Sequence, residues 1–360
     1  MAYLRTATRY AVVFTDALTG EVRGELPLID VKQTEVLNLP GSLTLGMALD
    51  PRRMNITAET VAPWRTIVYL LRDDSVLGCG AFVLGHQMDV GGNSITLSCV
   101  GIGEYFRHRY LRQDLMQVGI DQALIVKALI DYAQAQSGGN IGVTTDYITA
   151  TGVLRDRTDW FGYARKNIGG LIADLAAVSN GFNFRYRSRR SGQVYVTDLT
   201  TSYPATGRVT NHVFELGGNV EVMGATVDGK DMVNFAESIG GGNADAAPIG
   251  AATNADSLNT TPLLESVTTY SDISDPSTLL AKSQRDIVIG SDPVTLPTLR
   301  ISPDGDPGIG QYVVGDRVRV RGSHGLLSLD ADYLITQTSL VVGTAAEYVD
   351  VVTAPVLLFV

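Results

Sequence analysis

Residues 80–100 read GAFVLGHQMDVGGNSITLSCV, and this stretch decides the fold class. Two runs rich in β-branched and apolar residues, at 80–84 and 94–100, flank the segment DVGGN at 89–93. Gly and Asn adopt the positive φ angles that a tight turn between antiparallel strands needs. The stretch therefore predicts a β-hairpin, and short strands at this spacing are typical of a β-barrel or a β-sandwich.

The residues before this hairpin carry the same strand signal. Tyr10–Phe14 and Val22–Ile29 flank a polar turn and predict another hairpin. Ser42–Leu45 alternates polar and apolar side chains with a period of two, as a half-buried strand does, and Trp64–Leu71 is a further β-rich run. Residues 1–110 are therefore predicted to form the first β domain.

The best helix signal covers Ile120–Gln136. Its predicted apolar stripe consists of Ile120, Leu124, Leu129, Ile130 and Ala133, and its polar side of Asp121, Gln122, Lys127 and Asp131. A second helix is predicted from about Ala164 to Ser179, followed by Asn180 and Gly181, where the glycine is expected to take the left-handed conformation of a C-cap. With a hairpin over 182–197, residues 111–205 are predicted to form an inserted α+β domain.

Strands return after residue 205. They are predicted at Val213–Leu216, Val220–Val227, Asp231–Ile239, Leu299–Ile301, Arg317–Arg321, Tyr333–Thr338 and Tyr348–Val352. A helix is predicted after Asp275 as N-cap, with Pro276 at its first position and Gly290 after its end. Residues 240–261 are rich in Gly, Ala, Asn and Asp and predict a flexible loop. Residues 206–360 are thus expected to be a second β domain that carries this loop.

The charge of the chain is unevenly distributed. The net charge is −10 over 360 residues; residues 1–100 hold 8 basic and 10 acidic residues, residues 101–200 hold 12 and 9, and residues 201–360 hold 8 and 19. A nucleic-acid-binding protein concentrates positive charge against the phosphates, and the C-terminal part does the opposite. DNA that meets this part is expected to slide past it.

No stretch of the sequence suggests a membrane segment or a secretory signal. No run of 18 uncharged apolar residues is present, and the first six residues, MAYLRT, lack an apolar signal region. The chain is therefore expected to be made in the cytoplasm. Its length predicts two or three domains.

No catalytic, cofactor-binding or metal-binding residue is predicted, and the chain is expected not to be an enzyme. The four histidines are far apart in sequence, at His86, His108, His212 and His324. Cys79 and Cys99 are interpreted as separate buried thiols, although neighbouring strands of one hairpin are an alternative. Asp304 and Asp306 are interpreted as a solvated turn because the other ligands of a calcium loop are missing. The carboxylate pairs are Asp73 with Asp74 and Asp156 with Asp159, and neither indicates a hydrolase.

A short basic cluster consists of Arg107, Arg109 and Arg112, interleaved with aromatic residues. Such a mixture is found in nucleic-acid-binding proteins. The alternative is a domain junction that packs its aromatic residues and leaves the arginines for salt bridges to a neighbouring subunit. The cluster is short and the chain is acidic, so these three arginines are predicted to be a subunit interface.

Taken in order, several of these segments resemble a known family. They are residues 64–80, residues 98–109, the helix start at 120–125, the step NGFNF at 180–184 and VGDRVRV at 314–320. The chain resembles the minor tail or tail-tip hub proteins of long-tailed siphophages of actinobacteria, which are similar to the baseplate hub proteins of contractile phage tails. The loop at 240–261 departs from that pattern.

The resemblance implies a mainly β fold with two tail-tube-like β-barrel domains and an α+β domain inserted between them. It further implies a homotrimer that forms a pseudo-sixfold ring in the virion tail tip, joins the tail tube to the tip, and gives passage to the genome during ejection. The implied partners are a distal tail protein, a tape measure protein and central tip or fibre proteins. Double-stranded DNA would pass without specific binding. No cofactor is implied.

Two other functions stay open from the sequence. One is a carbohydrate- or receptor-binding adhesion module of the tail, and the other is a tail-associated cell-wall hydrolase. An adhesion module presents exposed aromatic platforms, whereas the aromatic residues here, 7% of the chain, lie mostly within predicted strands. A hydrolase needs a carboxylate or metal constellation, and the sequence does not indicate one.

Overall fold

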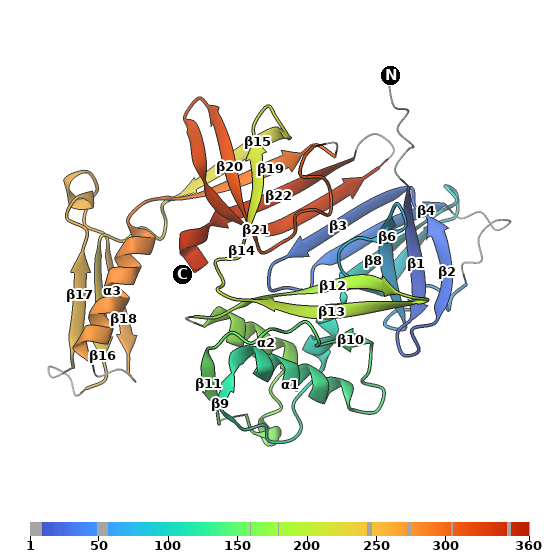
Figure 1. The fold of residues 1–360 in the computed structure, drawn as a ribbon, viewed down its shortest axis with the longest axis horizontal. Helices are drawn as coiled ribbons and strands as arrows, with labels where there is room; N and C mark the ends of the chain where they lie inside the picture. Colours follow the sequence, from blue (N-terminus) through green and yellow to red (C-terminus); the bar gives the residue numbers. More distant parts are fainter. Residues whose placement is uncertain are drawn as a thin grey trace. The chain divides into compact units, whose positions relative to one another are not determined.

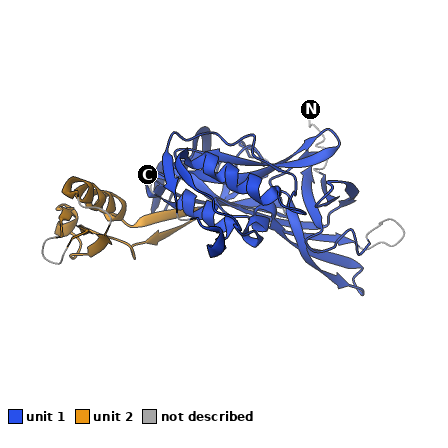
Figure 2. Ribbon diagram, turned by 90° about the horizontal axis from the view of Figure 1, so that it is seen from below, with its two compact units in different colours: residues 1–223, 298–360 blue, residues 224–297 orange. Residues whose placement is uncertain are grey.

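The computed structural model describes residues 9–48, 57–158, 160–178, 180–242, 247–271, 275–303, 305–343 and 347–359. The protein is mainly β, with a large sheet and a few helices (Figure 1). The predicted fold class, mainly β with an α+β segment, is thereby confirmed. The chain divides into two compact units, residues 1–223 with 298–360 and residues 224–297 (Figure 2).

The first half of the large sheet consists of strands that are close in sequence. They are β1 (Tyr10–Asp16), β2 (Val22–Pro27), β3 (Asp30–Val36), β4 (Ser42–Ala48), β5 (Thr66–Arg72), β6 (Ser75–Val76), β7 (Ala81–Asp89) and β8 (Ser94–Gly101). The two predicted hairpins are present, because β1 pairs with β2 and β7 with β8, both antiparallel. In the β7–β8 turn it is Asn93 that takes the positive φ angle, 48°.

The α+β part of the first unit follows. It comprises η1 (Ile102–His108), β9 (Gln117–Asp121), α1 (Gln122–Gln134), β10 (Val143–Thr144), β11 (Leu154–Arg157), η2 (Gly162–Ala164), α2 (Ile168–Ala177), β12 (Asn183–Ser191) and β13 (Val194–Ser202). Its helices share a hydrophobic core with the sheet, in which Phe82 and Phe106 belong to the same cluster as Leu129 and Leu175. This core ties the α+β part to the first half of the sheet.

The buried face of helix α1 differs in part from the predicted amphipathic pattern. Asp121 is its N-cap and accepts a hydrogen bond from the Ala123 amide at 2.8 Å. Leu124, predicted in the apolar stripe, is 43% exposed, whereas Gln122, predicted on the polar side, is fully buried. The Gln122 amide donates to the Asn180 carbonyl at 2.9 Å, which satisfies the buried side chain. Both predictions were wrong, because the helix face that packs into the core contains Ile125, Val126 and Leu129, which turns Gln122 inward and Leu124 outward.

Helix α2 begins later than predicted because of its cap. Asn167 accepts a hydrogen bond from the Gly170 amide at 2.8 Å, so the helix starts at Ile168 and not near Ala164. After the helix, Asn180 takes the left-handed conformation, with φ 56°, in place of the predicted Gly181. Asn tolerates this conformation better than other residues with a Cβ, so either residue satisfies the turn.

The second half of the large sheet contains the strands expected at the end of the chain. They are β14 (Arg208–Glu215), β15 (Val220–Asp228), β19 (Val294–Ile301), β20 (Asp316–His324), β21 (Leu327–Val342) and β22 (Glu347–Pro355), followed by η5 (Val356–Phe359). β14 pairs with β20 in parallel, whereas β20, β21 and β22 are antiparallel neighbours.

Strand β21 joins the two halves of the sheet. Residues 327–334 of β21 pair with β20, and residues 337–342 pair with β3, about 300 residues earlier in the chain. The register with β22 shifts between Ile335 and Gln337, and such an irregularity bends a strand. The strand order is therefore continuous from β15 to β2, and one hydrophobic cluster contains residues of both halves, such as Leu97 and Val320.

The second compact unit, residues 224–297, is a small sheet with one helix (Figure 2). Its elements are β16 (Phe235–Gly240), β17 (Ile249–Thr253), η4 (Ser257–Asn259), β18 (Glu265–Tyr270) and α3 (Pro276–Gly290). The predicted N-cap Asp275 and the first-turn Pro276 are confirmed, and Gly290 is the last helical residue rather than the one that follows.

The flexible loop predicted over the whole of residues 240–261 needs correction. β17 lies within it and pairs antiparallel with β16, whereas residues 243–246 lie outside the described residues. The Ser283 hydroxyl of α3 donates to the Gly250 carbonyl at 2.7 Å. Backbone pairing and this hydrogen bond replace the large apolar side chains whose absence had predicted a loop.

The division into domains at residues 110 and 205 stays a prediction. The compact units separate elsewhere, because the pairing of β3 with β21 keeps the first and last predicted domains within one unit.

Candidate functional site

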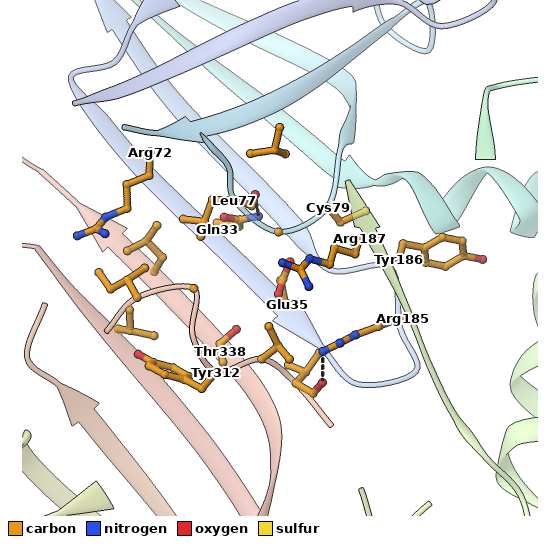
Figure 3. Close-up of a pocket in the computed structure, with 18 of the residues that line it drawn as sticks. Gln33, Glu35, Arg72, Leu77, Cys79, Arg185, Tyr186, Arg187, Tyr312 and Thr338 are labelled. Carbon is orange, nitrogen blue, oxygen red and sulfur yellow. Dashed lines mark hydrogen bonds between the residues drawn. The ribbon is translucent and has the colours of Figure 1, made fainter. Parts of the chain in front are cut away.

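A pocket of about 450 Å³ lies where the two halves of the sheet approach β12 (Figure 3). It is lined by residues of β3, β12 and β21, by residues 72–79 around β6, and by the loop 309–314. All of these belong to the first compact unit. The volume falls within the range of small-molecule sites in proteins.

Strand β3 presents alternate side chains to this pocket. Gln33 and Glu35 lie opposite Leu340 and Thr338 of β21, and all four line the pocket. Gln33 is buried and its amide donates to the Leu77 carbonyl at 3.2 Å. Gly78, with φ 70°, lets the chain pass close to β3, because a Cβ there would overlap the side chains of Gln33 and Glu35.

One end of the pocket is charged. Figure 3 shows Glu35 beside the side chains of Arg185 and Arg187, which project from β12. An Arg185 Nη1 donates to the Val314 carbonyl at 3.3 Å, and no salt bridge of Arg185 or Arg187 is found among the described residues. Burial raises the pKa of the Glu35 carboxyl, while the charge of Arg185 and the Cys79 amide act against that shift.

The other end of the pocket holds Arg72 and Tyr312 (Figure 3). Arg72 is satisfied, because its Nε donates to the Tyr10 hydroxyl at 3.0 Å and an Nη lies 3.4 Å from Glu347. The Tyr312 hydroxyl is different. Tyr312 is 4% exposed, and its oxygen has no hydrogen-bond partner within the described part of the chain. Burial raises the pKa of Tyr312, so the phenol keeps its proton and can donate it in a hydrogen bond.

Glu35→Gln is expected to change how stability depends on pH. The pKa of Glu35 is raised in the folded state above its ordinary value of 4.5. The contribution of Glu35 to stability is therefore greatest below that ordinary value and is lost as the pH rises through the raised pKa. The Glu35→Gln substitution removes this fall. Urea unfolding between about pH 5 and pH 8 measures it, with Glu21→Gln, an exposed carboxyl in the β1–β2 turn, as control. An unchanged profile in Glu35→Gln would contradict the prediction.

An arginine–aspartate ladder covers one face of β20 and β21. Arg319 lies 2.7 Å from Asp330 and 3.4 Å from Asp332; Arg317 lies 2.8 Å from Asp332, and Arg321 lies 3.0 Å from Asp330. Hydrogen bonds from Arg319 and Arg321 hold the pKa of Asp330 below its usual range. The arginines of this hairpin are thus neutralised within the chain, although each such exposed pair stabilises the fold by only about 0–1 kcal/mol.

The three arginines of the predicted subunit interface have different surroundings. Arg107 lies 3.7 Å from Glu104, and Arg109 donates to the Tyr105 hydroxyl at 2.7 Å and to the Ala133 carbonyl at 3.0 Å. The Arg112 residue is exposed, and no partner of its guanidinium is found in the described ranges. Arg107 and Arg109 therefore have partners inside the chain, and the role of the three arginines as a subunit interface stays a prediction.

The other candidate residues from the sequence, the cysteines, histidines and aspartates, do not form a site in the part of the chain that the structure describes. Cys79 and Cys99 are free thiols, and burial raises the pKa of each to about 12. His108 packs edge-on against Trp64 with ring centroids 4.7 Å apart. Asp159 and Asp304 lie outside the described residues. Among the residues that are described, no three His, Cys, Asp or Glu side chains form a group suited to a metal ion, and no helix has the length and apolar character to cross a membrane.

Solved structures of phage tail proteins share this fold along the whole chain. A 43 kDa tail protein of prophage MuSo2 from Shewanella oneidensis has a TM-score of 0.65 at 11% identity, covering 97% of this chain and 99% of that one. A tail protein from Neisseria meningitidis MC58 has a TM-score of 0.60 at 11% identity, covering 96% of each chain.

A secretion-system component has a similar fold. The Escherichia coli protein c3393, described as a type VI secretion system component similar in structure to the T4 bacteriophage tail proteins gp27 and gp5, has a TM-score of 0.53 at 10% identity. The match covers 91% of this chain and 73% of the c3393 chain. The sequence itself matches no protein-family model, and no curated protein is significantly similar to it. The comparisons therefore show that this chain has the fold of phage tail and baseplate-hub-like proteins.

Proposed function

We propose that the chain is the structural hub of a phage tail tip, in a long-tailed phage of actinobacteria. Three copies form a pseudo-sixfold ring that joins the tail tube to the tip and lets the genome pass during ejection. Its neighbours in the virion are a distal tail protein, a tape measure protein and central tip or fibre proteins. The chain has no enzymatic role in this proposal.

The two-part sheet is the observation that carries the proposal. β21 bends between two partners, so one chain holds two β portions in a continuous sheet with a shared core. A hub must match a sixfold tube to a threefold tip, and two tube-like portions per chain supply six units from three copies. Two structures of tail proteins match this chain over nearly its whole length, which supports the same function.

The charge ladder on β20 and β21 supports passage of DNA without binding. Arginines free to contact phosphates would release counterions and retain the genome. Here Arg317, Arg319 and Arg321 already pair with Asp330 and Asp332. The acidic excess of residues 201–360 as a whole, 19 acidic against 8 basic residues, repels a polyanion.

One observation favours the adhesion function as a second candidate. Tyr163 is 80% exposed and stacks on Phe161, with ring centroids 5.4 Å apart and planes 13° apart. The exposed Tyr163 ring, held against the half-buried Phe161, suits the face of a sugar ring. Binding of host cell-wall polysaccharide that is lost in Tyr163→Ala would favour this candidate, because the ring proposal requires no such binding.

The purified chain is expected to form trimers at high concentration, with three copies per ring in intact tails. Light scattering and a subunit count in a particle reconstruction measure this. Arg112→Glu is expected to weaken the ring if the basic cluster lies between subunits, whereas Arg190→Glu, an exposed arginine of β12, serves as the matched control. Six copies per ring, or a stable isolated dimer, would refute the hub.

A further inference from the structure

Among the described residues, the pocket beside β3 contains one buried hydroxyl without a hydrogen-bond partner and two arginine side chains without a salt bridge. The Tyr312 hydroxyl is buried and has no hydrogen-bond partner within the described part of the chain, although burying a hydroxyl without a hydrogen bond is unfavourable. Arg185 and Arg187 reach the opposite end without a salt bridge to any described residue. Between the two ends the wall is apolar and includes Leu77, Ile309, Leu340 and Val349.

We propose that this pocket binds a small amphipathic molecule with a carboxylate at one end and a hydrogen-bonding oxygen at the other. The carboxylate binds Arg185 and Arg187, the aliphatic body lies against Leu77 and Leu340, and the distal oxygen accepts a hydrogen bond from Tyr312.

The donor groups at the two ends of the pocket select this chemistry. Arginine guanidinium and phenol groups supply N–H and O–H donors, which match the oxygens of a carboxylate. Glu35 is the carboxyl group beside the two arginines, and a dianionic phosphate would be repelled by it more strongly than a monoanion. An amine would pair with Glu35 but would meet the two arginines as like charges.

The dimensions and position of the pocket favour a free small molecule. A volume of about 450 Å³ accommodates a compact aliphatic chain with two polar ends. Every lining residue belongs to a single compact unit of one chain, so the site is complete in a monomer and does not depend on ring formation.

Three probes of equal chain length test the site: hexanoate, 6-hydroxyhexanoate and hexanamide. Titration calorimetry and ligand-observed NMR on the full chain measure their affinities. Hexanoate is expected to bind about tenfold or more tightly than hexanamide, because its charge-assisted hydrogen bonds are lost in the amide. The hydroxylated acid is expected to bind a few-fold more tightly than hexanoate.

Three variants assign the effects to residues. Arg185→Gln is expected to remove the preference for hexanoate over hexanamide, and Tyr312→Phe to remove only the advantage of the hydroxyl group. Glu35→Gln is expected to tighten hexanoate binding, since it removes a neighbouring negative charge. Arg190→Gln, on the same strand as Arg185 but outside the pocket lining, is expected to change nothing.

Circular dichroism and thermal unfolding of each variant separate loss of binding from loss of the fold. Equal affinities for the acid and the amide, weaker hexanoate binding in Glu35→Gln, or no saturable binding of any probe to the folded chain would each overturn the proposal.

Discussion

Replacing Gly101 with alanine is expected to lower the free energy of unfolding by about 3 kcal/mol or more. Gly101 is the buried last residue of β8, where the strand passes the turn between β3 and β4. A Cβ at this position would overlap the Pro40 carbonyl oxygen and lie 2.7 Å from the Pro40 carbonyl carbon. Because the obstacle is backbone, it cannot rotate away, and either β8 or the turn must move.

Gly85→Ala is the matched control for this substitution. Gly85 lies on β7, in the same sheet, and a Cβ there would have no atom within 4 Å. This variant is expected to stay within about 1 kcal/mol of the parent, with a small gain from the less flexible unfolded chain. Urea unfolding of both variants measures the difference. Equal stabilities would mean that the turn at Pro40 can move at little energetic cost and that the stability of the fold does not depend on the close packing of β8 against it.

The sequence predicted the local elements well where turn chemistry and side-chain alternation agree. The hairpin at 80–100 and the cap at Asp275 follow from residues close in sequence, and both are present. The α1 stripe was predicted correctly at Leu129, Ile130 and Ala133 but wrongly at Leu124, because the face that packs into the core includes Ile125 and Val126 instead. Strand β17 was missed, since backbone pairing orders it without large apolar side chains.

The candidate site was not predictable from the sequence, because its parts are far apart in the chain. Glu35, Arg185 and Tyr312 come together only once β3 pairs with β21 and the α+β part adds β12. One signal was present: an alternation that buries Val31 also directs Gln33 and Glu35 to the same face. A carboxyl group on the buried face of a strand indicates a site or a buried ion pair.

Ser339→Pro is expected to lower the free energy of unfolding by about 3 kcal/mol or more and to prevent ring assembly. Ser339 lies in the part of β21 that pairs with Thr34 of β3 on one side and with Asp350 of β22 on the other. Proline there removes a backbone donor from a strand that has neighbours on both edges. The loss falls on the only described pairing between the two halves of the sheet, so the halves are expected to separate and the pocket to open.

Two controls separate the backbone effect from the side-chain effect. Ser339→Ala removes only the hydroxyl contacts, 3.1 Å to the Thr34 oxygen and 3.5 Å to the Gln337 amide nitrogen, and is expected to cost about 1 kcal/mol. Val22→Pro places proline at the first residue of β2, which ends the strand order, where it is tolerated. Urea unfolding measures stability, and light scattering measures assembly. A Ser339→Pro variant that still formed trimers would show that the two halves hold the ring independently, and the hub would then not depend on the continuity of the sheet through β21.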